Sequence, residues 1–360
     1  MTLTRLRLLN FRNYESLDLS FYEGVNAVLG RNGSGKTNLA EAVHYLSLAR
    51  SFRSSDDEPL IRHGCETAVL EAEISEGELR RTLEIEIGKG AKRVKLNGKP
   101  LRRLSELSRL VNVLLFCPSD VALFTGSPSE RRNFLDVSLS KQSSDYFRLI
   151  SRYGATLKER NALLKQAQPD LALLDVLTDQ LIDLEEPLVS YRSLFLSNLE
   201  STLPGVLSRL RGEATGAELI YRPFVKPGDG FKERAKKAYE ASKESDLLHR
   251  STSVGVHRED FSFRFNGKDV ATYGSQGENR MAALALKLSP YYLIEKEERK
   301  PICVLDDVTS ELDAKKIENL LALLKDFHQT FLTTTDITIE NATYIDVASN
   351  KATRRNEHGR

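Results

Sequence analysis

The chain has 360 residues and is 40% hydrophobic, which suffices for two domains or for one large domain with an insertion. Lysine and arginine total 52 against 51 acidic residues, so the net charge of +1 indicates no particular partner. The three cysteines, Cys65, Cys117 and Cys303, lack the paired spacing of a zinc or redox site, and no run of about twenty apolar residues would span a bilayer. With no signal peptide at the start, we expect a soluble, cytoplasmic protein.

The first ninety residues predict strands around one helix. Alternating apolar residues at 3–9 and 17–21 indicate two strands joined by a turn at Asn13. Residues 24–29 form a short, mostly apolar strand that enters a glycine-rich loop. Beyond the loop, apolar residues recur from Leu39 at i, i+3, i+4 and i+7, which predicts a helix with one buried face. Alternation at 68–74 and 79–87 then predicts antiparallel strands.

The remainder of the chain is first strand-like, then helical, then mixed. From Pro128 to Pro204 the pattern is helical, and prolines 169, 187 and 204 indicate several medium helices rather than one long rod. Further elements are expected as strands at 111–116, 218–224, 251–265, 302–305 and 330–334 and as helices at 231–248, after Gly277 and at 314–327. We predict an α/β head in two parts, 1–125 and 216–360, separated by a mainly helical insertion at 126–215, with no long coiled coil.

A phosphate-binding motif lies between the strand at 24–29 and the helix that follows it. The eight residues Gly30, Arg31, Asn32, Gly33, Ser34, Gly35, Lys36 and Thr37 fit G-x-x-x-x-G-K-[ST]. Glycines let successive backbone N–H groups face one anion, and the helix adds its positive N-terminal end. Lys36 is expected at the β- and γ-phosphates of ATP and Thr37 at Mg²⁺. A chance match in an ordinary turn is the alternative, but the strand before and the helix after favour the P-loop (Walker A motif).

A second acidic motif follows the apolar strand at 302–305. Asp306 is expected to contact Mg²⁺, and Asp307 to polarise the attacking water. The alternative is a strand followed by an acidic helix N-terminus, because residues 310–313 (Ser-Glu-Leu-Asp) also resemble a cap. The Walker A motif favours the catalytic interpretation (Walker B), with Lys36, Asp306 and Asp307 as catalytic residues.

The stretch Tyr273–Arg280 precedes a helix and allows two compatible readings. Ser275 and Glu278 fit the capping box S-x-x-E, which predicts an ordinary helix start. Ser275 and Gly277 also form an N-terminus that could approach a γ-phosphate. Because this chain already has its own P-loop, that phosphate would belong to a partner subunit.

The stretch from Lys89 to Arg109 carries eight basic residues and one acid. It is a candidate for contact with the DNA backbone, through Lys92, Arg93, Lys95, Arg102 and Arg103. A solvated face balanced by acids elsewhere is an equally good reading.

Taken in chain order, the Walker A motif, the Ser275–Glu278 stretch and the Asp306–Asp307 pair resemble the ABC-type ATPase heads of the SMC group, and the chain more closely resembles the RecF family of bacterial recombinational repair proteins. The closer resemblance covers nearly the whole chain and includes a stretch specific to that family at 127–136. It rests on residues 9–14, 32–38, 51–53, 127–136, 255–260 and 305–313.

The resemblance implies an ATP-dependent homodimer that clamps duplex DNA near single-strand gaps and hydrolyses ATP slowly to time its release. It implies ATP and Mg²⁺ as cofactors, RecR and also RecO as partners, RecA as the recombinase that is loaded indirectly, and a cytoplasmic, nucleoid-associated location. The alternatives are a transporter-type ATPase subunit and another SMC-like DNA-binding ATPase. The basic segment and the family-specific stretch favour the clamp.

The chain departs from the family pattern and from ABC heads at several positions. Asp307 stands where ABC heads carry glutamate, and no glutamine occurs between Asn38 and Lys141, so Ser119 or Asp120 is expected in place of the γ-phosphate-sensing glutamine. Thr333 or Thr334 replaces the switch histidine. Val256 and Glu278 stand where proline and glutamine are usual, and the sequence assigns no role to His257 or Arg258.

Overall fold

The computed structural model describes residues 1–348 and 350–355 and divides into two compact units. The first comprises Met1–Asp120, Gly205–Ala214 and Leu284–Arg360, and the second comprises Val121–Pro204 and Thr215–Ala283. This division differs from the three predicted segments, because all of 216–283, expected in the head, groups with the helical insertion. In the part of the chain that the structure describes, no helix is long and apolar enough to cross a membrane.

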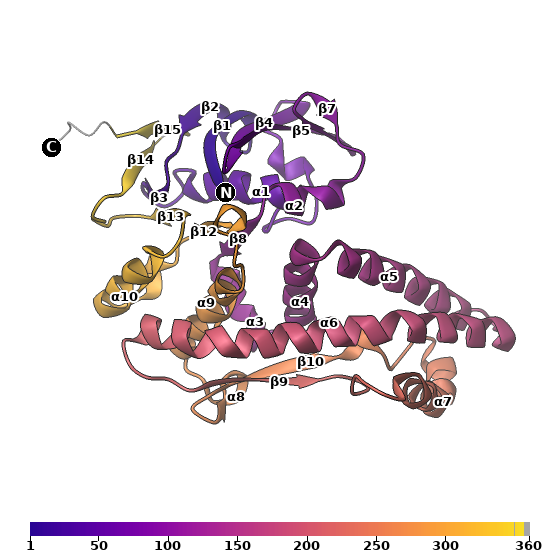
Figure 1. The fold of residues 1–360 in the computed structure, drawn as a ribbon. Coiled ribbons are helices and arrows are strands. Elements are labelled where there is room, and N and C mark those ends of the chain that lie inside the picture. The colour runs from indigo at the N-terminus through magenta and orange to yellow at the C-terminus, as the bar shows by residue number, and fades with distance from the viewer. Residues whose placement is uncertain (349, 356–360) are drawn as a thin grey trace. The chain divides into compact units, whose positions relative to one another are not determined.

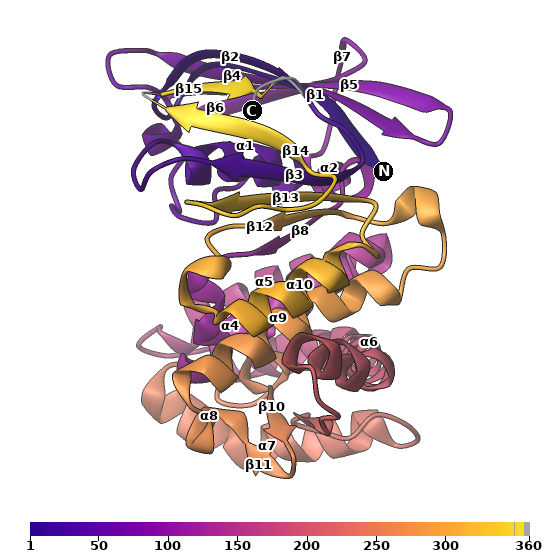
Figure 2. The same cartoon turned by 90° about the vertical axis from the view of Figure 1, so that its left-hand side faces the viewer.

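The first unit contains two six-stranded sheets (Figures 1 and 2). One is antiparallel, in the order β2-β1-β4-β5-β6-β7; the other, in the order β15-β14-β3-β13-β12-β8, is parallel except for β15. The antiparallel strands are β1 (Thr2–Phe11), β2 (Tyr14–Ser20), β4 (Thr67–Glu76), β5 (Leu79–Gly88), β6 (Ala91–Leu96) and β7 (Lys99–Pro100). Those of the mainly parallel sheet are β3 (Gly24–Leu29), β8 (Val113–Phe116), β12 (Ile302–Leu305), β13 (Gln329–Thr334), β14 (Thr343–Ala348) and β15 (Lys351–Arg354).

Helix α1 (Lys36–Leu48) belongs to the core that joins these two sheets. The apolar residues predicted from Leu39 onward are buried, and they pack in one cluster with inward residues of both sheets, such as Leu6 and Val304. Alternation along β1 and β4 puts apolar side chains on this inner face and charged ones on the other, as expected for a sheet with one solvated face. Two further helices of this unit are α2 (Leu107–Leu110) and α10 (Ala314–Leu324).

Register in the mainly parallel sheet determines where its loops meet. Leu305 of β12 pairs with Leu332 of β13, which in turn pairs with Ala27 of β3. Since all three strands run the same way, the loop after Leu29, the residues after Leu305 and the end of β13 share one edge of the sheet, where ligands of α/β proteins bind.

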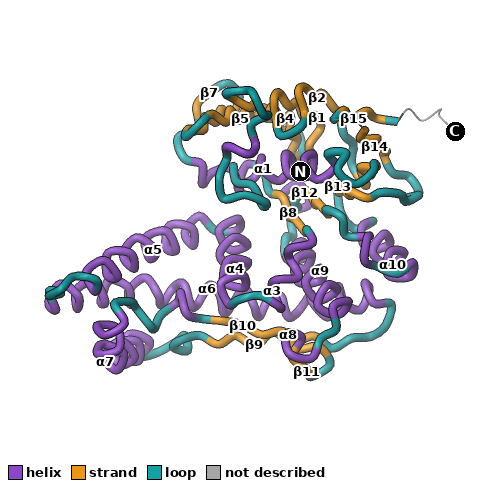
Figure 3. The backbone as a smooth tube through the Cα atoms, turned by 180° about the vertical axis from the view of Figure 1, so that it is seen from behind, coloured by secondary structure: helices purple, strands orange, loops and turns teal. Residues whose placement is uncertain are grey.

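The second unit combines helices with the three-stranded sheet β11-β10-β9. The β9–β10 pair runs alongside α6 in Figures 1 and 3, and the fully buried Arg192 of α6 bonds Glu259, just before β10. These contacts are why residues after 215 group with the insertion rather than with the head. The elements are α3 (Ala122–Thr125), α4 (Pro128–Gln142), α5 (Ser144–Leu164), α6 (Leu171–Arg211), β9 (Ala217–Arg222), α7 (Phe231–His249), β10 (Asp260–Phe265), β11 (Lys268–Asp269), α8 (Val270–Tyr273) and α9 (Gln276–Tyr292). The C-terminal ends of α6 and α9 continue into the first unit.

The prediction of several medium helices between 128 and 204 was wrong for its second half. Helix α6 runs for 41 residues through Pro187 and Pro204. A proline inside a helix removes one backbone hydrogen bond and crowds the preceding turn, at a cost of about 3 kcal/mol. The buried stripe that includes Leu181, Leu188 and Leu199 offsets that cost by packing.

The strand predicted at 251–265 begins only at Asp260. Before it, side chains occupy the backbone donors that a strand would need: Asn161 accepts from the N–H of Thr252, and Asp246 accepts from that of Ser253. The backbone then turns at Gly255, whose φ of +121° favours glycine. Other predicted elements agree with the structure to within a few residues.

Candidate nucleotide site

The loop from Gly30 to Thr37 follows β3 and opens α1, as the sequence predicts. A Cβ at Gly30 would lie 2.3 Å from the carbonyl oxygen of Val347 in β14 and 2.6 Å from the Ser34 hydroxyl. Gly33 and Gly35 have φ angles of +78° and +116°, in the region that favours glycine. The loop therefore leaves no room for a side chain at Gly30 or Gly35, where a Cβ would lie 2.8 Å from the Asn13 amide nitrogen, whereas at Gly33 the backbone angle alone favours glycine.

Two side chains of the loop are prepared for an anion. The Lys36 ammonium donates to the carbonyl oxygens of Gly30 and Arg31, at 2.7 and 3.0 Å, so it lies over the loop. Burial lowers the pKa of Lys36, while the charges of Asp307 and Asp306 act against this. The Ser34 hydroxyl is buried and has no hydrogen-bond partner among the described residues. Arg31 and Asn32 are exposed at the loop tip.

Asp306 lies beside Thr37, as the two motifs predict. Its Oδ1 accepts hydrogen bonds from the hydroxyls of Thr37 (3.1 Å) and Thr333 (2.7 Å). Burial raises the pKa of this carboxyl, and the two hydrogen bonds act in the opposite direction. A neighbouring hydroxyl and carboxylate are oxygen ligands of the kind that Mg²⁺ prefers, and waters and phosphates complete the coordination shell of the ion. These residues therefore fit the expected ion.

Asp307 adopts an unusual backbone conformation next to this pair. Its φ is +50°, in the left-handed region, and its N–H donates to the Thr333 hydroxyl at 2.9 Å. Thr333, at the end of β13, thus links both aspartates, whereas Thr334 pairs with Thr309 at 2.9 Å. Of the two residues considered at the switch position, Thr333 is the one that contacts Asp306.

Asp120 and Ser119 are held by neighbours in the same unit. Asp120 accepts from the N–H of Cys117 at 2.9 Å and pairs with Lys287 at 2.8 Å. The Ser119 hydroxyl lies 3.1 Å from the Cys117 sulfur. These contacts give Asp120 a structural part, and a sensing role for either residue stays a prediction.

Ser275 and Gly277 start α9 with the predicted capping box. Glu278 accepts from both the N–H (2.9 Å) and the hydroxyl (3.0 Å) of Ser275, and the Ser275 hydroxyl accepts from the N–H of Glu278 at 3.3 Å. The carboxylate is thus used as a cap. Nothing lies within 4 Å of the position a Cβ would take on Gly277. These residues belong to the second unit, and their part in a nucleotide site stays a prediction.

The five basic candidates for DNA binding have different surroundings. Lys92 of β6 pairs with Asp57 at 2.6 Å and donates to the carbonyl of Ala49, so it connects the β5–β6 hairpin to the end of α1. The β5–β6 register brings Lys95 within 2.7 Å of Glu84 and Arg93 within 3.9 Å of Glu86. Arg102 and Arg103 are exposed. DNA binding by this segment stays a prediction.

His257, which is half-buried, is part of a polar cluster in the second unit, and Arg258 is exposed at its edge. The Tyr153 hydroxyl is 2.6 Å from Nδ1 of His257, whose Nε2 lies 3.0 Å from the Thr252 carbonyl oxygen. Burial lowers the pKa of His257 to about 4. Arg258 also donates to Thr252. These contacts give both residues a structural part.

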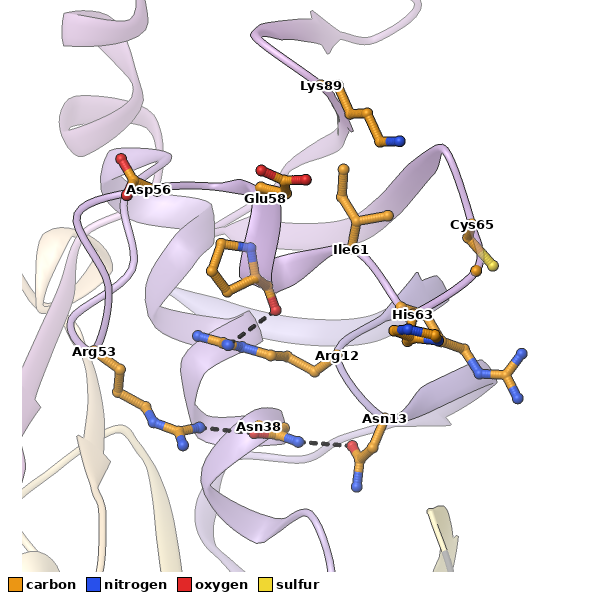
Figure 4. A pocket seen from close by; sticks show the side chains of 13 residues that line it. Arg12, Asn13, Asn38, Arg53, Asp56, Glu58, Ile61, His63, Cys65 and Lys89 are labelled. Carbon is orange, nitrogen blue, oxygen red and sulfur yellow. Dashed lines mark hydrogen bonds between the residues drawn. The ribbon is translucent and has the colours of Figure 1, made fainter.

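A pocket of about 750 Å³ opens beside the Walker A helix (Figure 4). Asn13, Asn38 and Arg53 line it in a chain of hydrogen bonds: Asn38 donates to Asn13 at 2.7 Å and accepts from Arg53 at 2.8 Å. These residues lie in family-like stretches of the sequence, which assigns them no role. Glu41, which is fully buried between Ala40 and Ala42, is not predicted by the sequence either. A charge within an apolar helix face was the available signal, since such a group must be paired.

Comparison with known proteins agrees with this geometry. The model of the RecF/RecN/SMC N terminal domain matches residues 2–357. A protein of Geobacillus kaustophilus (strain HTA426) named DNA replication and repair protein RecF is 40% identical over 347 residues, covering 94% of this chain and 93% of that protein. One of the same name from Bacillus cereus (strain G9842) is 36% identical over 357 residues, covering 96% and 95%.

Solved structures give the same result at two levels of similarity. A structure of the recombination mediator protein RecF with ATPrS in the RecFOR pathway superposes with a TM-score of 0.89 at 31% identity, covering 98% of each chain. An Smc head bound to the C-winged helix domain of ScpA has a TM-score of 0.62 at 15% identity, which shows the fold alone. The predicted SMC-like ATPase head is thereby confirmed. With the family model matching nearly end to end and relatives this similar, the chain belongs to the RecF family of DNA replication and repair proteins.

Proposed function

We propose that this protein is an ATP-dependent DNA clamp of recombinational repair. It binds Mg·ATP, dimerises on duplex DNA near single-strand gaps, hydrolyses ATP slowly and assists RecR and RecO in loading RecA. The observation that carries the nucleotide part is the 3.1 Å contact between Thr37 and Asp306 beside the Walker A cradle. Solved RecF structures with ATP and with ATPrS, both described as part of the RecFOR pathway, support the proposal further.

The nucleotide corner comprises the Gly30–Thr37 loop together with Asp306, Asp307 and Thr333. In this proposal its residues have distinct tasks. Backbone N–H groups of the cradle bind phosphate oxygens, and Lys36 exchanges its two carbonyl partners for them. Thr37 and Asp306 would hold Mg²⁺, which neutralises charge on the phosphates when bound. A cation there favours the ionised form of Asp306, against the effect of burial. Asp307 polarises the attacking water and accepts its proton.

The pocket in Figure 4 is proposed as the nucleoside site. It starts at Asn38, next to Thr37 of the cradle, and Asn13 and Arg12 form one side of it. At about 750 Å³ it has room for a base and a ribose. Asparagine amides supply both donors and acceptors, as recognition of a base or sugar requires.

The clamp is tested by its response to nucleotide. Light scattering of the full chain is expected to give dimer mass with ATP and Mg²⁺, more so with gapped duplex DNA, and monomer mass without nucleotide. Lys36→Arg should stay monomeric, because a guanidinium cannot replace a compact ammonium between phosphates. A wild-type protein that stays monomeric under every condition, or whose hydrolysis does not respond to duplex DNA, would contradict the clamp and favour a transporter-type ATPase subunit.

The proposal extends to a composite site in which Ser275 and Gly277 meet the ATP of the partner subunit. Ser275→Arg should then leave ATP binding by the monomer intact but block dimer closure. Mixing it with Lys36→Met protein gives a heterodimer with one doubly altered site and one intact site, so two inactive proteins should recover up to about half of wild-type activity. Loss of ATP binding by monomeric Ser275→Arg would instead mean that the segment acts within its own chain.

A further inference from the structure

Glu41 is the fully buried carboxylate of the Walker A helix, and it holds three other groups. Arg12 donates to both of its oxygens, at 2.8 and 2.7 Å, in a bidentate pair. The Ser51 hydroxyl donates to its Oε1. The guanidinium of Arg53 lies 3.6 Å from its Oε2. A buried carboxylate with these partners resists rearrangement, because loss of one leaves charge unpaired in the interior.

The Ser51 hydroxyl connects Glu41 to the backbone of the residues that follow it. It accepts hydrogen bonds from the N–H groups of Arg53 and Ser54, at 2.9 and 3.0 Å, which closes a tight turn. Arg12 contributes from the far end of the same segment, since its third guanidinium nitrogen donates to the Pro59 carbonyl at 2.9 Å (Figure 4). Residues 51–59 are thus fixed to α1 through Glu41.

Arg53 lines the proposed nucleoside pocket at the end that adjoins the Walker A motif. Its guanidinium donates to Asn38, which directly follows Thr37 (Figure 4). Its charge also acts to lower the pKa of Asp306. Although it contacts Glu41 and Asn38, the side chain remains 44% exposed, so it retains free donors for an anion.

We propose that Glu41 is a positioning residue that, with Ser51, holds Arg53 where its guanidinium neutralises negative charge on the terminal phosphates of the bound nucleotide. This rests on the proposed binding of Mg·ATP in the cradle. A guanidinium suits the task because its planar fork matches phosphate oxygens and stays charged at all working pH values. Holding it in advance removes the cost of ordering a long side chain when the reaction occurs.

A double-mutant cycle on the full chain tests this proposal. ATP turnover is measured over a range of ATP concentrations for wild type, Glu41→Gln, Arg53→Ala and the double variant, with thermal unfolding recorded for each. Arg53→Ala is expected to lower kcat/KM about tenfold or more, and Glu41→Gln about fivefold. The double variant should be no slower than Arg53→Ala, because Glu41 acts through Arg53. Arg50→Ala, an exposed neighbour, is the matched control and should behave as wild type.

Ser51 provides a second route if Glu41→Gln does not fold. Ser51→Ala should lower kcat/KM as Glu41→Gln does, and Ser51→Thr should restore it, because threonine keeps the hydroxyl. Effects of Glu41 or Ser51 that simply add to that of Arg53→Ala would overturn the positioning role. Lys36→Ala distinguishes failure of the proposed nucleotide site from failure of the positioning role. If Lys36→Ala turns over ATP like wild type, the proposed nucleotide site is wrong. If it is inactive while the effects of Glu41 and Arg53 add, only the positioning role fails.

Discussion

The nucleotide corner of the first unit and the polar cluster of the second are both built from family-like motifs, yet they treat polar groups differently. At the corner, Lys36 is held only by loop carbonyls and the Ser34 hydroxyl has no partner among the described residues. In the cluster, Arg192 bonds Tyr146, the Val256 carbonyl, Glu259 and Asp136, so its donors are used within the protein.

This difference distinguishes residues that bind a ligand from residues that stabilise the fold. Most polar groups that a fold buries are paired, and in the cluster the protein supplies every partner of Arg192, although Oε2 of Glu185 has none among the described residues. At the corner the Ser34 hydroxyl has no partner among the described residues, and the partners of Lys36 are neutral carbonyl oxygens, which phosphate oxygens can replace. Stretches of both regions contribute to the resemblance to the family, and the contacts show which region has polar groups available to a ligand. Changes at the corner should therefore affect turnover with little effect on stability, and changes in the cluster the reverse.

The largest expected effect is on turnover at Asp307. Asp307→Asn should lower the turnover rate by about a hundredfold or more, because the amide cannot accept the proton of the attacking water. Asparagine tolerates the left-handed backbone at this position, so folding should be preserved. The measurement is ATP hydrolysis together with ATP binding by calorimetry. Unchanged hydrolysis would remove Asp307 from the mechanism, and lost binding would assign it to ATP affinity instead.

The next effect is on stability, at Gly255 in the cluster. A Cβ there would lie 2.4 Å from Glu185, 2.7 Å from the Tyr239 hydroxyl and 2.9 Å from the Tyr153 hydroxyl. Gly255→Ala should therefore lower the free energy of unfolding by at least about 3 kcal/mol. Gly228→Ala is the control, because Gly228 also has a positive φ, of +106°, but nothing lies within 4 Å of its Cβ position. Equal losses in urea unfolding would show that backbone strain alone matters.

A smaller effect is the pH dependence of stability that Glu185 confers. Burial raises its pKa to about 8, so the folded chain holds a proton that the unfolded chain releases above its ordinary value of 4.5. The unfolding free energy should therefore fall as pH rises toward 8. The lowered pKa of His257, about 4 against 6.5, has the opposite effect below pH 6.5. Between pH 6.5 and 8, Glu185 should contribute a loss of at most about 2 kcal/mol.

Glu185→Gln checks this assignment, because the amide keeps the shape of the side chain and cannot titrate. Its unfolding free energy, measured in urea at pH 6.5 and at pH 8, should change less than that of the wild type. The same fall in both proteins would assign the pH dependence to another group.

The smallest effect concerns DNA binding by the basic segment. Replacing Arg102 and Arg103 by glutamine should reduce the slope of log K against log salt by up to about 0.9 for each DNA phosphate that the variant no longer neutralises. Replacing Lys92 and Lys95 should act mainly on stability, because both are engaged in ion pairs. The salt dependence of duplex binding measures this, and a greater reduction of the slope at Lys92 and Lys95 would reverse the assignment.

Much of the nucleotide corner could be predicted because its residues lie in short contiguous sequence motifs. The Walker A loop needs a strand, a glycine-rich turn and a helix, which are contiguous, and Asp306 follows an unmistakable buried strand. Partners distant in sequence could not be predicted in this way. The 3.6 Å approach of Arg53 to Glu41 depends on how residues 49–57 fold back on α1, which no pattern encodes.

The remaining differences have physical causes of the same kind. Helix α6 continues through Pro187 because tertiary packing exceeds the local preference to stop. The ion pairs of Lys95 and Arg93 depend on the β5–β6 register, which places each opposite a glutamate. The sequence shows the basic residues, but it does not show which residues lie opposite them on the neighbouring strand.

The central claim is that the cradle from Gly30 to Thr37 binds the phosphates of ATP through Lys36. Calorimetric titration of ATP with Mg²⁺ into the full chain tests it most directly, with Lys36→Ala beside Lys315→Ala, an exposed lysine of the same unit. We predict that Lys315→Ala binds ATP as the wild type does, and that Lys36→Ala loses at least about a hundredfold in affinity, since a charge-assisted contact contributes about 3 kcal/mol. Equal affinity in all three proteins would contradict the account.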